Sequence, residues 1–299
     1  MKTKFKSIIR AAYHSFSGTV CAGAVMLAFS APAQNLFTSK NDNLIEIAPN
    51  GTQTIFISGF YTPLDLAFNS AGDLFEADMF GHSIYKFTPG GVQSTFASGF
   101  GTPLGLAFDS AGNLFVADWQ NGNIIKITPG GTQSTFASGL FYPEGLAFNN
   151  AGDLFVAGQG NGNIYEFTPD GTQSTFASGV GAPNGLAFNS AGDLFVANEG
   201  GNIIEITPGG TQSIFASALY YPQKLAFNSA GDLFVVDMNG TIYEFTPSGV
   251  QSTFASGMSG NGPLAFQGET LPVPEPSILG LLAVGATALL VRRHRNLAA

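Results

Sequence analysis

One twelve-residue phrase recurs five times along this chain with small changes. It reads LAFNSAGDLFVA at 186–197 and has near copies at 66–77, 106–117, 146–157 and 225–236. The repeated glycines lie 40, 40, 40 and 39 residues apart, at Gly72, Gly112, Gly152, Gly192 and Gly231. A period near 40 residues is typical of β-propeller blades and of α-solenoids, so the fold is a repeat array.

The interior of each repeat favours the propeller. The segments GLAFNS, GDLFVA, NIIEITP and TQSTFASG are short, rich in β-branched and aromatic residues, and bounded by Gly, Pro and Asn. No stretch of the array has helical periodicity long enough for a solenoid helix. Four strands per repeat predict a four-stranded antiparallel blade, with glycine and proline supplying the NSAGD and TPGG turns.

The partial repeats at the two ends predict the number of blades. Five complete repeats run from about Tyr61 to Gly257, residues 35–59 match strands two to four, and residues 262–266 match strand one. Three N-terminal strands and one C-terminal strand would complete a sixth blade and pair edges that would otherwise be exposed. We therefore predict an all-β fold over residues 34–268, a six-bladed propeller of four-stranded antiparallel blades.

Residues 1–33 have the pattern of a secretory signal peptide. Four basic residues precede an apolar stretch at about 18–29, and Ala31-Pro32-Ala33 fits a cleavage site after Ala33. An N-terminal membrane anchor is the alternative, and the shortness of the apolar run argues against it. Cys21, the only cysteine, lies in this segment, so we expect a mature chain without disulfides.

The C-terminal segment 269–299 has three parts in order. A Pro-rich linker at 269–277 contains Pro274-Glu275-Pro276, an apolar run follows at 278–291, and Arg292, Arg293 and Arg295 come after it. The apolar run is shorter than the roughly 20 residues of a usual transmembrane helix, and its basic end favours the cytoplasmic side.

This arrangement resembles the PEP-CTERM sorting signal of Gram-negative bacteria. The resemblance implies that a short transmembrane helix within 278–299 anchors the protein in the membrane before processing. It further implies an exosortase-type processing enzyme as partner, removal of the tail, and a final location at the cell surface or in an extracellular matrix. An ordinary C-terminal anchor, with proline as a spacer, is the alternative.

Charge excludes one class of partner. Between the two basic ends, 20 acidic residues are balanced by only four lysines, a net charge of −16. A body this acidic repels phosphate backbones, so we do not expect nucleic acid to bind.

The repeat also resembles known propellers. The stretch PNGLAFNSAGDLFVANEGGNIIEITPGG at 183–210 is similar to the NHL repeat and to the SMP-30/gluconolactonase and streptogramin-lyase-like propellers. The resemblance covers about residues 35–266. It implies architecture more than activity, because these folds carry many unrelated functions.

Variation between repeats points to one face of the disc. The loops from strand four to the next strand one, and from strand two to strand three, differ in every repeat, and an up-and-down blade places both at the same end. A binding face needs such loops, and flat aromatic rings beside Asn, Gln and Asp suit sugar rings. Drift in surface loops, with aromatic rings that only cap the blades, is the alternative. The expected ligand-binding face comprises Phe60, Tyr61, Phe80, His82, Phe100, Trp119, Phe141, Tyr142, Tyr220 and Tyr221.

A second candidate lies at the tunnel mouth. The residues after the blade-opening prolines are Leu64, Leu104, Glu144, Asn184 and Gln223. PEGLAF and PNGLAF resemble the segments in which SMP-30-like propellers hold metal-ligating Glu and Asn. The resemblance implies that Glu144 and Asn184 hold a divalent cation such as Ca²⁺, although Gln223 stands where a further carboxylate is expected. A water-filled polar tunnel is the alternative, and no cofactor is required by the fold.

Catalytic groups are scarce. The predicted mature body holds one histidine in the array, His82, and no cysteine, and no nucleophile elbow or zinc-binding helix motif occurs. Asp78, Asp118 and Asp237 end strand two of three repeats and are interpreted as turn residues that bind backbone N–H groups. We therefore expect an exported, non-enzymatic binding protein for carbohydrate, exopolysaccharide or a protein ligand. The alternatives are a metal-dependent lactonase or lyase that acts through Glu144 and Asn184, and a scaffold that only spaces other partners.

Overall fold

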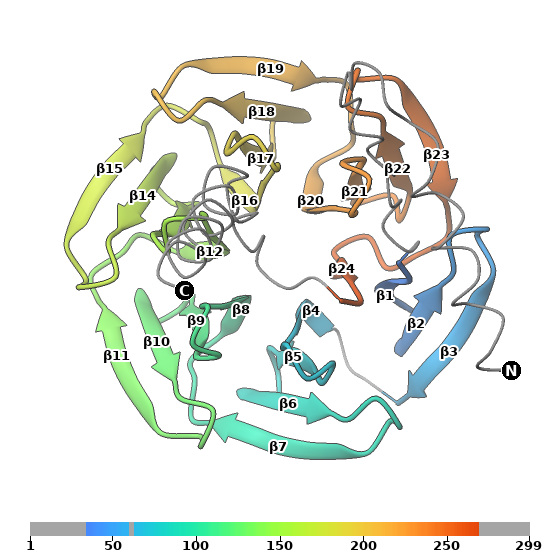
Figure 1. Ribbon diagram of the computed structural model, residues 1–299, viewed down its shortest axis with the longest axis horizontal. Helices are drawn as coiled ribbons and strands as arrows, with labels where there is room; N and C mark the ends of the chain where they lie inside the picture. The colour runs from blue at the N-terminus through green and yellow to red at the C-terminus, as the bar shows by residue number, and fades with distance from the viewer. Residues whose placement is uncertain (1–33, 60–62, 269–299) are drawn as a thin grey trace, which may run out of the picture. The chain divides into compact units, whose positions relative to one another are not determined.

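The repeat builds six four-stranded antiparallel sheets around a central axis in the computed structural model (Figure 1). The chain separates into two units, Met1–Ala31 and Pro32–Ala299, and the structure describes residues 34–59 and 63–268 of the second. Several predicted features lie outside the described residues: the signal peptide with Ala31 and Ala33, the loop residues Phe60 and Tyr61, and the tail with Pro274, Glu275 and Pro276.

Each blade runs outward from the axis through four strands. The first, innermost strands are β4 (Pro63–Phe68), β8 (Pro103–Phe108), β12 (Pro143–Phe148), β16 (Pro183–Phe188), β20 (Pro222–Phe227) and β24 (Ala265–Phe266). The second strands are β5 (Leu74–Asp78), β9 (Leu114–Asp118), β13 (Leu154–Gly158), β17 (Leu194–Asn198), β21 (Leu233–Asp237) and β1 (Leu36–Lys40). The third strands are β6 (Ser83–Phe87), β10 (Asn123–Ile127), β14 (Asn163–Phe167), β18 (Asn202–Ile206), β22 (Ile242–Phe245) and β2 (Asn43–Ile47). The outermost strands are β7 (Gln93–Ser98), β11 (Gln133–Ala137), β15 (Gln173–Ala177), β19 (Gln212–Ala216), β23 (Gln251–Ala255) and β3 (Gln53–Ser58).

The ring closes as predicted, with strands from the two ends of the described chain in one sheet. In the sixth blade the strand order is β24-β1-β2-β3. Leu36 lies opposite Phe266 and Phe37 lies opposite Ala265 in an antiparallel pair. This closure pairs strand edges that would otherwise be exposed, as predicted from the partial repeats.

A trio of phenylalanines forms the core between neighbouring blades. Phe115 of β9 packs edge to face on Phe136 of its own outer strand, at 5.0 Å between ring centroids, and on Phe148 of the next blade, at 5.1 Å. Such pairs contribute about 0.5–1.5 kcal/mol beyond area burial. The sixth blade makes the same inter-blade contacts through Phe37–Phe68 and Phe234–Phe266, both at 5.0 Å.

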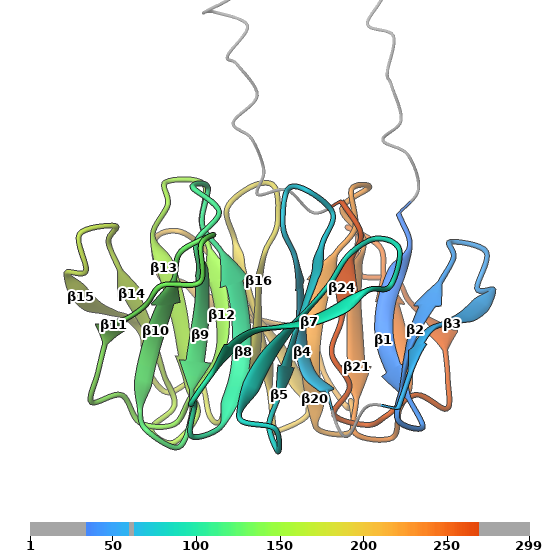
Figure 2. The same ribbon diagram turned by 90° about the horizontal axis from the view of Figure 1, so that it is seen from below.

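The conserved turns and the variable loops lie at opposite ends of the blades (Figure 2). In one NSAGD turn, the Asn189 side-chain oxygen accepts from the backbone N–H groups of Ala191 and Asp193, and Gly192 has a φ of +90°. A positive φ is why this position is glycine in every complete repeat. We call this end, formed by the NSAGD and TPGG turns, the constant-turn face.

The opposite end is the variable-loop face, formed by loops such as 99–102 and 119–122 and their equivalents. These two loops contact each other, because the Trp119 N–H donates to the Thr102 carbonyl at 2.9 Å. The first and last described residues, Gln34 and Gly268, lie at the constant-turn face, where the Gln34 side chain donates to the Gln267 carbonyl (Figure 2).

Candidate functional site

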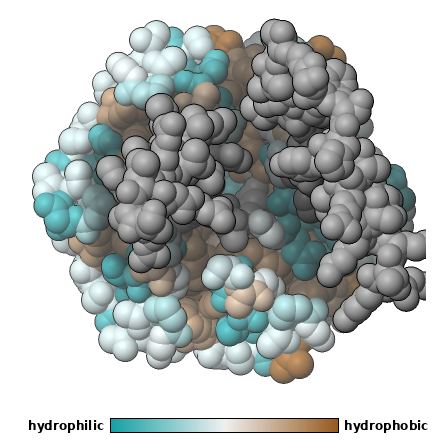
Figure 3. Space-filling view, in the orientation of Figure 1, coloured by the Kyte–Doolittle hydropathy of each residue, from teal (hydrophilic) through white to brown (hydrophobic). Residues whose placement is uncertain are grey.

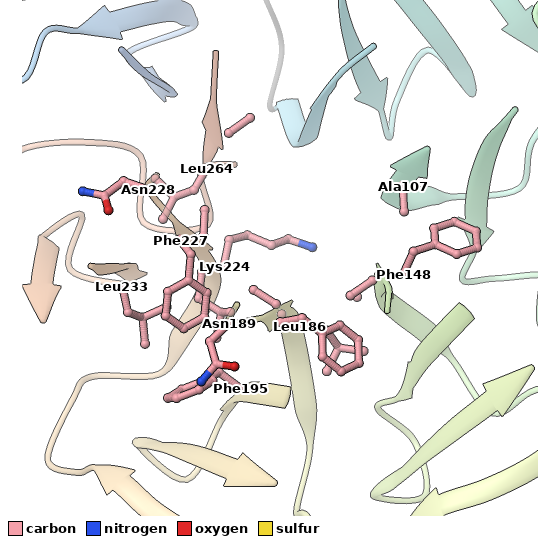
Figure 4. Close-up of a pocket in the computed structure, with 18 of the residues that line it drawn as sticks. Ala107, Phe148, Leu186, Asn189, Phe195, Lys224, Phe227, Asn228, Leu233 and Leu264 are labelled. Carbon is pink, nitrogen blue, oxygen red and sulfur yellow. The ribbon is translucent and has the colours of Figure 1, made fainter. Parts of the chain in front are cut away.

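A cavity of about 1300 Å³ occupies the centre of the propeller and opens at the constant-turn face. Its wall is formed by the Leu-Ala-Phe segments of the first strands, and its rim by Asn and Ser of the NSAGD turns (Figure 4). The space-filling view of this face shows hydrophobic residues gathered around its centre (Figure 3). Both candidate sites predicted from the sequence lie at the other end of the blades, so this cavity was not predicted.

Charged side chains form the inner end of the cavity. Lys224 of β20 extends into it (Figure 4), and its Nζ lies 3.9 Å from Oδ2 of Asp65 and 3.8 Å from Oε1 of Glu144. Asp65 belongs to the first complete blade, Glu144 to the third and Lys224 to the fifth. We call these three residues the tunnel triad.

Asp65 and Lys224 were missed as site residues, although the repeat contains a signal for them. The equivalent position is glycine in the three blades between them, Gly105, Gly145 and Gly185. A Cβ on Gly145 would lie 2.2 Å from the Asn184 carbonyl oxygen, so only glycine fits there. A charged residue at a position where three other repeats require glycine indicates a site on the tunnel wall.

Burial dominates the electrostatics of the tunnel triad. Burial raises the pKa of the Asp65 carboxyl, and the positive charge of Lys224 opposes that rise. Burial likewise raises the pKa of Glu144, again opposed by Lys224, while Glu199 and Asp65 add to the rise. Lys224 is only 7% exposed, and its Nζ has no hydrogen-bond partner among residues 34–59 and 63–268.

The divalent cation that the resemblance implies does not fit this donor set. The Asn184 side-chain oxygen accepts from Gln159 at 3.2 Å, one Glu144 oxygen faces the Lys224 ammonium, and the Gln223 amide donates to the Tyr221 carbonyl. Ca²⁺ takes six to eight oxygen ligands, with carboxylates prominent among them. In the described part of the chain, no group of three or more His, Cys, Asp or Glu could hold a metal ion.

The variable-loop face contains a hydrogen-bonded network that crosses three blades. Trp119 donates from Nε1 to Oε1 of Gln159 at 3.1 Å, and Gln159 donates from Nε2 to Asn184 at 3.2 Å and to Glu199 at 3.0 Å. Trp119, Gln159 and Glu199 are equivalent residues of successive repeats, 40 positions apart. Trp119 and Asn184 were predicted from the sequence, but Gln159, which connects them, and Glu199, which accepts a further bond from Gln159, were missed.

Trp119 also stacks on Tyr142, one of the other predicted residues of this face. Their ring centroids are 4.4 Å apart and the rings are 22° from parallel. Because Tyr142 comes from the loop of the next blade, this contact joins two variable loops. We call Trp119, Tyr142, Gln159, Asn184 and Glu199 the aromatic–amide network.

The other predicted aromatic residues divide between the surface and the core. His82 lies on the face, where its Nδ1 is 2.6 Å from the Gly101 carbonyl oxygen. Phe100 was predicted wrongly: it is 6% exposed and packs in the core between two blades. The exposed aromatic residues of the variable-loop face are Phe80, Phe141, Tyr142, Tyr220 and Tyr221.

Two of these tyrosines have an unusual backbone conformation. Tyr142 and Tyr221 each precede a blade-opening proline and have φ values of +50° and +48°. A bulky residue with positive φ is strained, and proline restricts the preceding residue further. Such strain persists only where the surroundings hold it, and it concentrates at functional positions.

The aspartates that end the second strands are structural, as the sequence analysis interpreted them. The Asp118 carboxylate accepts from the backbone N–H groups of Gly101 and Thr102 at 3.0 and 2.9 Å, and from the Asn121 amide at 2.8 Å. Asp78 accepts from the N–H groups of Phe80 and Gly81. These residues hold the variable loops in place.

Comparison with solved structures gives the fold but little sequence similarity. A chain of a nidogen/laminin complex matches with a TM-score of 0.70 and 20% identity, over 78% of this chain and 98% of that chain. Virginiamycin B lyase from Staphylococcus aureus matches with a TM-score of 0.59 and 17% identity, over 71% and 76%. A gluconolactonase from Xanthomonas campestris matches with a TM-score of 0.59 and 16% identity, over 65% and 75%. At these identities the likeness is one of fold.

Residues 272–295 match the PEP-CTERM protein-sorting motif. The chain is therefore an exported β-propeller protein that is anchored by its C-terminal segment before processing by an exosortase-type system. No curated protein matches the sequence. Within residues 34–59 and 63–268, no helix has the length and apolar character needed to span a membrane.

Proposed function

We propose that this protein is a surface- or matrix-associated binding protein of a Gram-negative bacterium, and that its variable-loop face binds carbohydrate. The aromatic–amide network carries the proposal. It places a stacked Trp119–Tyr142 pair directly beside the amide of Gln159 and the carboxylate of Glu199. A sugar ring offers C–H groups that stack on an aromatic face and hydroxyl groups that bind amides and carboxylates.

The surrounding residues support a ligand larger than one ring. Further exposed aromatic side chains lie on the loops of other blades, among them Phe80, Tyr220 and Tyr221. Aromatic residues spread over several loops suit an extended chain of sugars, because each ring adds a separate stacking contact. The net charge of the body favours neutral or amino sugars over acidic ones, because like charges repel.

The point at which the chain leaves the propeller also favours the variable-loop face as the binding face. Gly268 lies at the constant-turn face, and the linker 269–277 separates it from the apolar run at 278–291. Nine residues span at most about 32 Å. While the C-terminal segment is anchored, the tether to the membrane therefore leaves from the constant-turn face, and the variable-loop face is the one opposite the tether. After removal of the tail, the same face is available at the surface or in the matrix.

Trp119 provides the test, because it is the only tryptophan in the chain. The purified protein is titrated with exopolysaccharide from the producing organism and screened on a glycan array, while tryptophan fluorescence is recorded. We expect saturable binding with a change in Trp119 emission. Tyr142→Ala and Tyr221→Ala are expected to weaken it about tenfold, as losing a contact of about 1.4 kcal/mol would.

The control is Ile214→Ala, which removes an exposed apolar side chain from an outer strand, away from the variable loops. It is expected to bind like the unchanged protein. The proposal fails if no glycan binds, or if the two tyrosine variants bind as tightly as the Ile214→Ala control.

A further inference from the structure

The tunnel triad combines one buried cation with two carboxylates from different blades. Lys224 Nζ is within 3.9 Å of Asp65 Oδ2 and 3.8 Å of Glu144 Oε1, so the ammonium lies between them. The third residues of the first strands in the three blades between Asp65 and Lys224 are Gly105, Gly145 and Gly185, which place no side chain in the path of the lysine. The long side chain can therefore cross the tunnel.

We infer that Lys224 is a built-in cation of the tunnel, which holds the carboxylates of Asp65 and Glu144 together in place of a bound metal ion. A buried charge is costly unless it is paired, and removal of one partner of a buried pair is more costly than replacement of the whole pair. With Lys224 present, the two carboxylates already share a positive charge and need no ion from solution.

The burial of Lys224 distinguishes it from the other lysines of the described residues. Lys86 pairs with Asp73 at 2.7 Å, Lys126 lies 3.8 Å from Asp109, and Lys40 donates to Gln53; all three lysines are partly exposed. Lys224 alone among them is buried. The ammonium also repels a divalent cation that approaches Glu144, and this repulsion is strong where water is excluded.

The same geometry predicts a cryptic cation site. If the ammonium is removed, the carboxylates of Asp65 and Glu144 lose their shared positive charge and become available as oxygen ligands, which is the chemistry that Ca²⁺ prefers. We therefore expect Ca²⁺ to stabilise the Lys224→Met variant but not the unchanged protein.

The experiment compares full-length protein variants by thermal unfolding, with chelator or with millimolar CaCl₂, and by calorimetric titration with CaCl₂. The unchanged protein is expected to show no stoichiometric binding and no shift of Tm. Lys224→Met is expected to lose roughly 10 °C of Tm in chelator and to recover part of it with Ca²⁺. Lys126→Met, which removes a lysine from an exposed pair, is expected to show neither effect.

A triple variant separates charge from packing. Asp65→Asn and Glu144→Gln, added to Lys224→Met, remove all three charges but do not restore the lysine side chain, so we expect most of the lost Tm to return and the Ca²⁺ response to disappear. Stoichiometric Ca²⁺ binding by the unchanged protein that Glu144→Gln abolishes would overturn the inference. A triple variant no more stable than Lys224→Met, or one that fails to fold alongside it, would also overturn it.

Discussion

Leu36 and Phe266 lie opposite each other in β1 and β24, although they belong to the two ends of the described chain. The next backbone bond of this seam runs from the Gln267 N–H to the Asn35 carbonyl at 2.9 Å. Because β24 has only two residues, side-chain packing must help the backbone hydrogen bonds to hold it in the sheet.

The first prediction concerns this seam. Phe266→Ala removes a buried ring that packs on Phe234 and is expected to lower the free energy of unfolding by about 3–5 kcal/mol. Denaturant unfolding measures the change. Phe141→Ala, which removes an exposed ring, is the control and is expected to stay within about 0.5 kcal/mol. Equal losses for the two variants would show that the seam does not need this ring.

The second prediction concerns the close approach of neighbouring first strands. Gly145→Ala places a Cβ 2.2 Å from the Asn184 carbonyl oxygen, which is backbone and cannot rotate away. We expect a loss of about 1–3 kcal/mol in the free energy of unfolding. Gly130→Ala, in a TPGG turn, meets nothing closer than 3.9 Å and is expected to be nearly neutral. If both variants unfold at the same denaturant concentration, the first strands are not as tightly placed as the structure has them.

The architecture could be predicted because the same strand-and-turn pattern occurs in five complete repeats. Period, turn residues and strand lengths all agreed on four-stranded blades, and the partial repeats predicted the closure of β24 on β1. Phe100 was misplaced because alternation within a loop does not reveal which ring turns inward, and this ring fills the space between two blades.

The site was harder to predict, because its residues come from different blades and are brought together only by the closed propeller. Trp119 and Glu199 are 80 positions apart, and a shared blade position connects them through Gln159. The approach of Lys224 to Asp65 and Glu144 depends on the tunnel diameter, which a pattern of residues does not specify. Departure from a repeat was the one available signal, and it marks Asp65 and Lys224.

Glu76 is a similar departure, and it carries the third prediction. It is fully buried in β5 at a position that is valine in the other four complete repeats, and neither carboxyl oxygen has a hydrogen-bond partner among the described residues. Burial, with a further contribution from Asp78, raises the pKa of Glu76 to about 8. The folded protein therefore keeps this carboxyl protonated at neutral pH.

The raised pKa of Glu76 makes the folded protein less stable at higher pH. Between the unfolded pKa of 4.5 and the folded pKa of about 8, the folded state binds a proton that the unfolded state releases, so stability falls as pH rises. The contribution of Glu76 to this fall is up to about 5 kcal/mol. Glu76→Val restores the repeat and is expected to remove that slope, measured by denaturant unfolding across this pH range. Parallel pH profiles for Glu76→Val and the unchanged protein would contradict the prediction.

The fourth prediction tests the proposed orientation of the anchored precursor. Cys21, the only cysteine, lies in the predicted signal peptide, so single cysteines can be introduced as markers. Ser190→Cys marks an exposed NSAGD turn of the constant-turn face, and Met238→Cys marks an exposed position on the variable-loop face. In cells that retain the unprocessed precursor, a bulky membrane-impermeant maleimide is expected to label Met238→Cys quickly and Ser190→Cys slowly, because the nine-residue linker after Gly268 tethers the protein to the membrane by its constant-turn face.

Detergent-solubilised precursor serves as the control, because it removes the bilayer without changing the chain. There the two cysteines are expected to react at similar rates, which excludes local burial as the cause of slow labelling. Equal labelling of the two positions in the membrane-held precursor would mean that the segment after Gly268 lets the disc turn freely. The variable-loop face would then have no preferred direction before the tail is removed.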